Sequence, residues 1–167
     1  MVTLSDLALE QSARHQVLVQ RFANHLSKEY DATQRRINDI VNSFLATLPD
    51  YELYQLESQL QLLSNRTEQE YSVYFDSVLG ELEQFAESEV EWEQNQAEEL
   101  TGSDFVAPAI AGVWAAILST PMVLEGSSQV ILVVDYIEQA KSAQSKKIVD
   151  IIRTGAYTNQ SVNNIRS

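Results

Sequence analysis

Residues 3–48 read TLSDLALEQSARHQVLVQRFANHLSKEYDATQRRINDIVNSFLATL, a stretch that contains neither Gly nor Pro. Side chains at steps of three and four lie on one face of an α-helix. At about 1.5 Å per residue an unbroken helix here exceeds roughly 60 Å, so the stretch predicts a strut. Ser27 or Asp31 is where a break would fall. The predicted stripe consists of Leu18, Phe22, Leu26, Tyr30, Thr33, Ile37, Val41, Phe44 and Leu48.

The next segment predicts a return along the first helix. Pro49 disfavours helical backbone in the residue before it, so Leu48-Pro49-Asp50 is expected to be a turn. Residues 51–63 then predict a short helix that ends at Ser64-Asn65. Thr67 and Glu70 have the spacing of a capping box, which predicts a new helix from Thr67 to about Leu100. Residues 1–100 are therefore expected to form a long helical hairpin with an acidic second half.

Residues 101–126 are expected to form an apolar connector. The segment 105–124 contains no charged residue and is long enough to cross a membrane, but Pro108, Gly112 and Pro121 weaken it as a single helix. One interpretation is a buried connector with a short helix. The other is a segment that inserts into a membrane, against which Trp114 argues because Trp prefers the membrane interface.

Residues 127–167 predict a helix, a glycine joint and a second helix. Ser127 or Ser128 is expected to cap the first helix. Gly155 is expected to end it, and Thr158 to cap the next one. The expected apolar stripes are Val130, Val134, Ile137, Ile148 and Ile151 on the first helix, and Val162 and Ile165 on the second. The whole chain is therefore predicted to be all-α.

Composition narrows the classes of function. The formal net charge is −13, and residues 67–104 carry twelve acidic residues without a Lys or Arg. Such a field repels phosphate, so we expect no specific nucleic-acid binding. The absence of Cys excludes a disulfide framework and thiolate metal sites. The N-terminus lacks the basic and apolar regions of a secretory signal.

The sequence offers few candidate site residues. His15 and His25 do not have the His-x-x-x-His spacing of a metal site and are expected to face solvent or to pack. No phosphate-binding glycine loop and no nucleophile motif is present. We therefore expect a protein that is not an enzyme, with no catalytic, cofactor-binding or metal-binding residues. A ladder of carboxylates is expected to be a solvated helix face: Glu81, Glu83, Glu87, Glu89, Glu91 and Glu93.

The C-terminal pattern resembles part of the Mu-type minor head proteins of tailed bacteriophages. Gly155 corresponds to the family's joint, Thr158 to its cap, and Val162 and Ile165 to its apolar pair. The resemblance covers the N-terminal helical part of that family. It implies a virion structural protein inside the head near the portal vertex, present in the host cytoplasm during assembly. It also implies portal, head or ejection proteins as partners, with multiple copies on a ring.

Two other functions remain open. The long stripes suit a helical adaptor of a cellular complex, and residues 105–124 suit a membrane-active ejection protein. A single hairpin partner would leave Leu4, Leu7, Leu9 and Val17 uncovered. Because like charges in residues 67–104 oppose self-association, we expect weak association of isolated copies and ordered copies only on a partner's ring.

Overall fold

The computed structural model describes residues 4–48, 53–123, 126, 128 and 130–158. It contains four helices in these ranges, α1 (Leu4–Thr47), α2 (Leu53–Thr101), α3 (Ile110–Ser119) and α4 (Val133–Tyr157). Two short strands, β1 (Pro121–Val123) and β2 (Val130–Leu132), lie between α3 and α4. The predicted all-α fold is confirmed.

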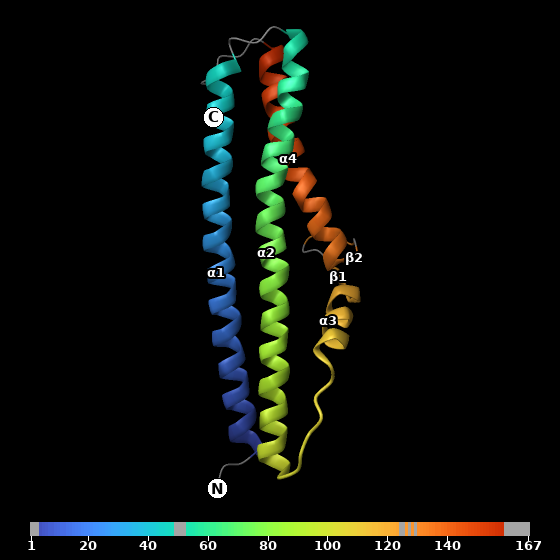
Figure 1. The fold of residues 1–167 in the computed structure, drawn as a ribbon. Helices are drawn as coiled ribbons and strands as arrows, with labels where there is room; N and C mark the ends of the chain where they lie inside the picture. The colour runs from blue at the N-terminus through green and yellow to red at the C-terminus, as the bar shows by residue number, and fades with distance from the viewer. Residues whose placement is uncertain (1–3, 49–52, 124–125, 127, 129, 159–167) are drawn as a thin grey trace.

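Helices α1 and α2 form the predicted antiparallel hairpin (Figure 1). At about 1.5 Å per residue, their 44 and 49 residues span roughly 65–75 Å. Helix α1 continues through Ser27 and Asp31 without a break. The exposure of Leu9 and Val17 is confirmed, whereas the side chains of Leu4 and Leu7 lie outside the described residues.

Thr67 does not begin a helix, so the predicted break at Ser64-Asn65 is wrong. Helix α2 runs without interruption from Leu53 to Thr101. The Thr67 side chain is fully buried, and its hydroxyl donates to the backbone carbonyls of Leu63 and Ser64. A hydroxyl in mid-helix can bond carbonyls of its own preceding turn instead of capping a new one. The capping pattern was therefore present without the helix end it usually marks.

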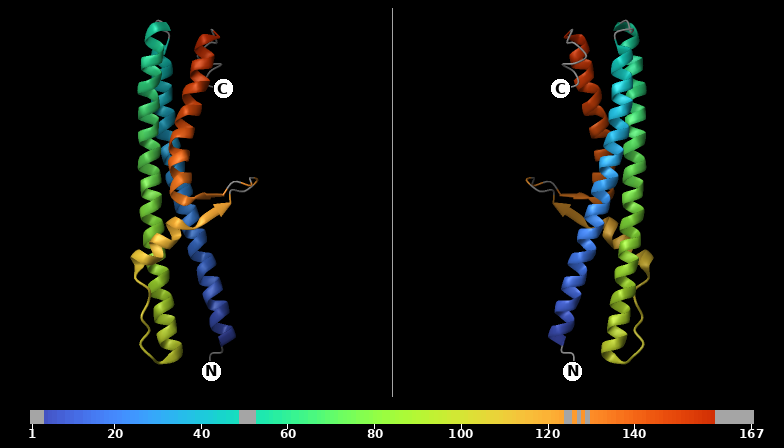
Figure 2. Two further views of the ribbon diagram at one scale, coloured as in Figure 1. Left: turned by 90° about the vertical axis from the view of Figure 1, so that its right-hand side faces the viewer. Right: turned by 90° about the vertical axis from the view of Figure 1, so that its left-hand side faces the viewer.

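We call the end of the hairpin where α1 ends at Thr47 and α2 begins at Leu53 its closed end. Helix α4 packs along one side of the hairpin near this end, which therefore contains three helices (Figures 1 and 2). The core cluster there is formed by Leu45 of α1, by Leu56, Leu60 and Leu63 of α2, and by Val149 and Ile152 of α4. Burial of these apolar side chains supplies the main driving force for docking α4.

The buried face of α4 differs from the predicted stripe. Val134 and Ile151 are exposed, and Val130 belongs to strand β2. Of the predicted positions, Ile137 is buried and Ile148 is partly buried against the cluster. The face that packs on the hairpin is Ile137, Lys141, Ser145, Val149, Ile152 and Gly155.

Polar partners explain why Lys141 and Ser145 can be buried. The Lys141 ammonium donates to Glu138 at 2.9 Å and to Asp76 of α2 at 3.1 Å. These hydrogen bonds, that to Glu138 first, raise the pKa of Lys141 although burial opposes the shift. Ser145 donates to the carbonyl of Ser64 at 2.8 Å and shares a further hydrogen bond with the Thr67 hydroxyl. Buried polar groups are tolerated when they are paired in this way.

The predicted glycine joint is also wrong. Gly155 lies inside α4 with its backbone buried, and the helix continues to Tyr157. Thr158 is the C-cap of α4, and its hydroxyl donates to the carbonyls of Thr154 and Gly155. The predicted second helix, with Val162 and Ile165, lies outside the described residues.

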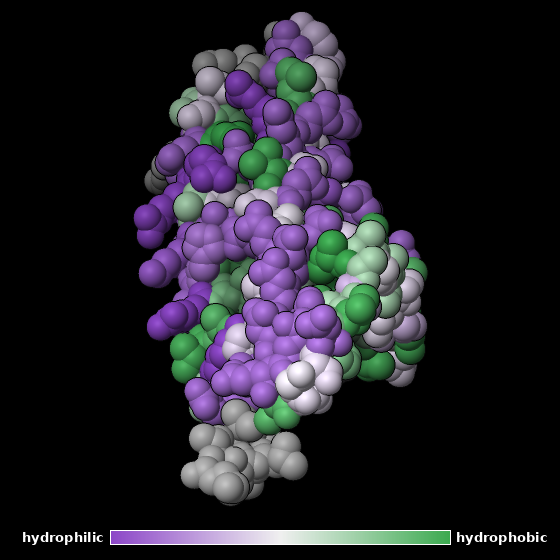
Figure 3. All heavy atoms as spheres, turned by 60° about the horizontal axis from the view of Figure 1, so that its bottom comes forward, coloured by the Kyte–Doolittle hydropathy of each residue, from purple (hydrophilic) through white to green (hydrophobic). Residues whose placement is uncertain are grey.

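The apolar connector is not sealed in the core. Helix α3 contains no buried residue, and Val106 before it is 91% exposed. Figure 3 shows apolar side chains gathered on the side of the molecule where α3 lies. After α3, strands β1 and β2 pair antiparallel and point away from the helices (Figure 2). Helix α4 begins at Val133, so it is not capped by Ser128, and Ser127 lies outside the described residues. None of the described helices is both long and apolar enough to cross a membrane.

Candidate functional site: an open groove on the hairpin

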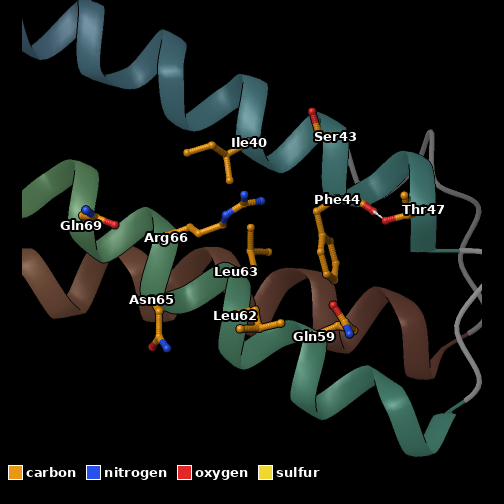
Figure 4. Close-up of a pocket in the computed structure, with 10 residues that line it drawn as sticks. All are labelled: Ile40, Ser43, Phe44, Thr47, Gln59, Leu62, Leu63, Asn65, Arg66 and Gln69. Carbon is orange, nitrogen blue, oxygen red and sulfur yellow. Dashed lines mark hydrogen bonds between the residues drawn. The ribbon is translucent and has the colours of Figure 1, made fainter.

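Helix α4 packs mainly on α2 at the closed end of the hairpin, and a hollow of about 650 Å³ remains between α4 and α1. A second groove, which α4 does not line, lies between α1 and α2 and has a volume of about 610 Å³. Ile40 and Phe44 of α1 and Leu62 and Leu63 of α2 supply its apolar lining (Figure 4). Leu62 is 55% exposed, so much of its side chain is accessible within the groove. The groove therefore presents apolar surface that the other described residues leave accessible.

Arg66 gives the groove its charge. Its side chain extends across the groove from α2 toward α1 (Figure 4). Among the described residues no carboxylate forms an ion pair with it, whereas Arg36 pairs with Glu70 at 2.7 Å and Arg153 with Glu57 at 3.0 Å. A guanidinium matches the geometry of a carboxylate well. The groove therefore has one cation available for an acidic partner.

The remaining groove residues are polar and uncharged. Ser43 and Thr47 donate to backbone carbonyls of their own helix, at Asp39 and Phe44. Their hydroxyls are therefore already used as donors. The rim is completed by Gln59, Asn65 and Gln69. Apolar lining, a polar rim and one cation are suited to noncovalent docking of an amphipathic helix.

We call the other half of the hairpin, which contains the N-terminal part of α1 and the C-terminal part of α2, its open half. The contacts that join the two helices there differ from those at the closed end. Cross-helix polar contacts join Ser77 to Glu29 at 3.3 Å, His25 to Glu81 at 3.1 Å and both Arg14 and His15 to Glu89 at 3.3 Å. Phe22 stacks on Phe85 with ring centroids 5.4 Å apart, and Arg14 lies 4.1 Å above the Trp92 ring. This half is thus joined by pairs of side chains, without the three-helix core of the closed end.

The predicted carboxylate ladder divides into two sets. Glu83, Glu87, Glu91 and Glu93 are exposed, as expected for a solvated face. Glu81 and Glu89 turn toward α1 instead, and their side chains are only 23% and 19% exposed. Glu81 contacts His25, and Glu89 contacts His15. Both histidines are exposed as predicted, and each has a carboxylate partner. Helical spacing alone indicated neither contact, because each depends on how α2 is aligned with α1.

Sequence reasoning missed both the groove and Arg66. Ile40, Leu62 and Arg66 show no distinguishing pattern, and the groove arises only when α1 and α2 pack side by side. The closing turns of α4 carry another ionic contact, in which Arg153 lowers the pKa of Glu57 mainly by donating a hydrogen bond to its carboxylate. That contact fastens α4 to α2.

No protein-family model, no curated protein and no solved structure matches this chain.

Proposed function

We propose that the protein is a non-enzymatic structural component that binds a helix of a partner protein in the open groove. The observation that carries this proposal is that exposed Leu62 lies beside Ile40, Phe44 and an Arg66 that forms no ion pair with another described residue. The partner helix carries apolar residues on one face and a carboxylate placed to reach Arg66. Its docking completes a four-helix arrangement at the closed end of the hairpin.

The shape of the molecule supports an architectural function. The hairpin presents its groove at one end of a rod roughly 70 Å long. The groove lies against the three-helix core, which fixes the backbone of both helices that line it. A preorganised surface loses little conformational entropy when a partner binds. Such a rod is suited to connecting components of a large assembly.

Within this class, we propose the head of a tailed bacteriophage as the assembly. The protein would then be a minor head protein near the portal vertex, in several copies around the portal ring, where it assists head assembly or genome delivery. This step rests on the resemblance of the C-terminal sequence pattern to Mu-type minor head proteins, although Gly155 lies inside α4 and does not form the joint that the resemblance implied. The acidic segment 67–104 supports it further, because such a surface stays beside packaged DNA without adhering to it.

Mass spectrometry of purified proheads and mature heads tests the assembly. Presence of the chain in either particle supports the proposal. If it is absent from both, the virion function is wrong, although a helix-binding function in another complex would remain.

Substitutions in the groove test the docking. We expect Leu62→Asp and Arg66→Glu each to weaken binding to the portal protein, because one places a charge on the apolar lining and the other repels the partner's carboxylate. Val73→Asp is the matched control, since Val73 is equally exposed on α2 but does not line the groove. Equal loss of binding in all three variants, or in none, would contradict docking in the groove.

A second function is favoured by the exposed connector. Phe105, Val106, Val123 and Val130 are exposed, and helix α3 between them has no buried residue. Large exposed apolar surfaces mark partner or membrane contacts. A membrane-active protein that uses residues 105–124 would float with liposomes, and replacing Val106 by Asp would reduce the floated fraction.

A further inference from the structure

A histidine and two carboxylates converge on the open half of the hairpin. His25 and Glu29 are separated by one turn of α1, so both lie on the same face of that helix. Glu81 reaches the same point from α2. One ligand atom from each of the three residues lies within 4.8 Å of the other two. The cluster therefore brings three metal-binding groups together from two helices.

The distances between these groups match the spacing of metal ligands. The imidazole Nε2 of His25 lies 3.1 Å from Oε1 of Glu81 and 3.5 Å from Oε1 of Glu29. Nitrogen and oxygen ligands bind Zn²⁺ at about 2.0–2.2 Å in a tetrahedral arrangement, which separates neighbouring ligand atoms by roughly 3.3–3.6 Å. Small side-chain movements are enough to place all three around one ion.

Neighbouring groups orient the site. The Ser77 hydroxyl donates to Oε2 of Glu29 at 3.3 Å, which leaves Oε1 directed toward His25. Hydrogen bonds of this kind from outside the ligand set hold ligands in position. The side chain of Glu81 is 23% exposed and that of His25 is 55% exposed. The ion would therefore keep at least one position open to water.

The charge around the cluster favours a cation. Residues 67–104 carry twelve acids and no Lys or Arg, and such a field raises the local concentration of cations. The nearest cations in sequence are Arg21 and Lys28, which are exposed and, among the described residues, form no ion pair with the cluster.

We propose that His25, Glu29 and Glu81 bind a divalent transition metal ion of the Zn²⁺ type, which bridges α1 and α2. One imidazole and two carboxylates suit Zn²⁺, whereas Mg²⁺ and Ca²⁺ prefer sites made of oxygen ligands alone. The bound ion joins the two long helices in the half of the hairpin that α4 does not cover. This site is separate from the groove, so its occupancy does not depend on the proposed partner.

The chain contains a matched control site ten residues away on α1. His15 faces Glu89 at 3.3 Å, much as His25 faces Glu81. Arg14 bonds to the same Glu89, so the control site has a cation where the other has a second carboxylate. Because a guanidinium repels a metal ion and has no lone pair to donate, this site should not bind one.

The test uses the untagged full chain after removal of metals with a chelator, titrated with Zn²⁺ by calorimetry. We expect one site per chain, and a Tm that rises with Zn²⁺ concentration because the ion binds the folded state. His25→Ala and the isosteric Glu81→Gln should each weaken binding by more than about tenfold, since losing even an orienting group outside the ligand set costs 10–100-fold in affinity. His15→Ala should bind Zn²⁺ like the unchanged chain.

Three results would overturn the proposal. The first is no Zn²⁺ binding by the unchanged chain, which would leave the cluster as an ion pair only. The second is equal loss in His15→Ala and His25→Ala, which would indicate general attraction to the acidic surface. The third is equally tight binding of Mg²⁺, which the imidazole ligand should not favour. Circular dichroism of each variant without metal verifies that the helices are intact.

Discussion

Replacement of Thr67 by Asp distinguishes a continuous α2 from two helices with a cap between them. Asp caps a helix as well as Thr does, so a capped break would leave Thr67→Asp about as stable as the unchanged chain. In the structure Thr67 is 0% exposed and lies between the helix backbone and Ser145 of α4. Among the described residues the Thr67 hydroxyl bonds Leu63, Ser64 and Ser145, none of which could neutralise a carboxylate at this position.

The size of the effect follows from the contacts. Leaving a buried charge without its partner costs about 3–5 kcal/mol. Thr67→Val keeps the shape and removes only the hydroxyl, while Ser145 still donates to the carbonyl of Ser64. The loss should then be about 1 kcal/mol. We therefore expect Thr67→Asp to be several times more destabilising than Thr67→Val.

Urea unfolding followed by circular dichroism measures both values. Ser58→Asp is the control, because Ser58 lies on the same helix, is exposed and bonds only its own backbone. A change within about 0.5 kcal/mol is expected for it. If Thr67→Asp unfolds at the same urea concentration as the unchanged chain, the buried position of Thr67 and the docking of α4 against it are both wrong.

Three further predictions concern helix stability, core packing and pH. Gly80→Ala in mid-α2 should stabilise the fold by about 0.5–1 kcal/mol, because an added Cβ meets open space. Gly102→Ala should destabilise the fold, because Gly102 has φ of 63°. Thermal unfolding compares the two variants, and equal shifts in Tm would contradict the helix end at Thr101. Leu60→Ala should lower the free energy of unfolding by about 2–5 kcal/mol, and Leu62→Ala, at an exposed position, by less than about 0.5 kcal/mol. Equal urea midpoints for the two variants would refute the assigned core. Because the pKa of Lys141 is raised in the folded state, its ion pairs stabilise the fold fully below about pH 10.4, and this stability is lost as the pH rises through the folded-state pKa. Lys141→Met should remove this loss of stability at alkaline pH. If the dependence of unfolding free energy on pH is unchanged in that variant, Lys141 is not its source.

The hairpin was predictable because its information is local. Neither Gly nor Pro occurs in residues 3–48 or in residues 53–79, and the apolar spacing keeps one face along each helix. The misplaced break at Thr67 also came from local information. Thr67-x-x-Glu70 fits a capping box, but Glu70 pairs with Arg36 of α1 instead of bonding back to its own helix. The choice between these outcomes is made by the neighbouring helix.

The docking face of α4 was not predictable from hydrophobicity. Its centre is Lys141 and Ser145, whose partners Asp76 and Ser64 lie far away in sequence on α2. A pattern of apolar residues cannot indicate such a face, since the polar residues Lys141 and Ser145 interrupt it in the middle. Strands β1 and β2 were not predicted for another reason. Each contains only three residues, which are too few to show an alternating pattern.

The proposed metal-binding cluster was not predicted, because no metal-binding residues were expected from the sequence, although part of its ligand set can be found there. His25 and Glu29 have the one-turn spacing that places two ligands on one helix face. Glu81 was visible only as one member of an acidic ladder. Which carboxylate of that ladder faces His25 depends on the alignment of α2 with α1, to which the core at the closed end contributes.

The two halves of the hairpin differ in how firmly they are held, and this difference separates the two proposed sites. On α1 the buried side chains are Thr33, Ile37 and Leu45, whereas the described side chains of residues 9–32 are exposed or half-buried. Local opening requires least free energy where few apolar side chains are buried. The open half should therefore open first. The groove lies in the half with more buried apolar side chains, whereas the proposed ion at His25 would bridge the helices in the half with fewer of them. Hydrogen exchange should then show Zn²⁺ protecting amides near His25 and Glu81 far more than those around Leu60.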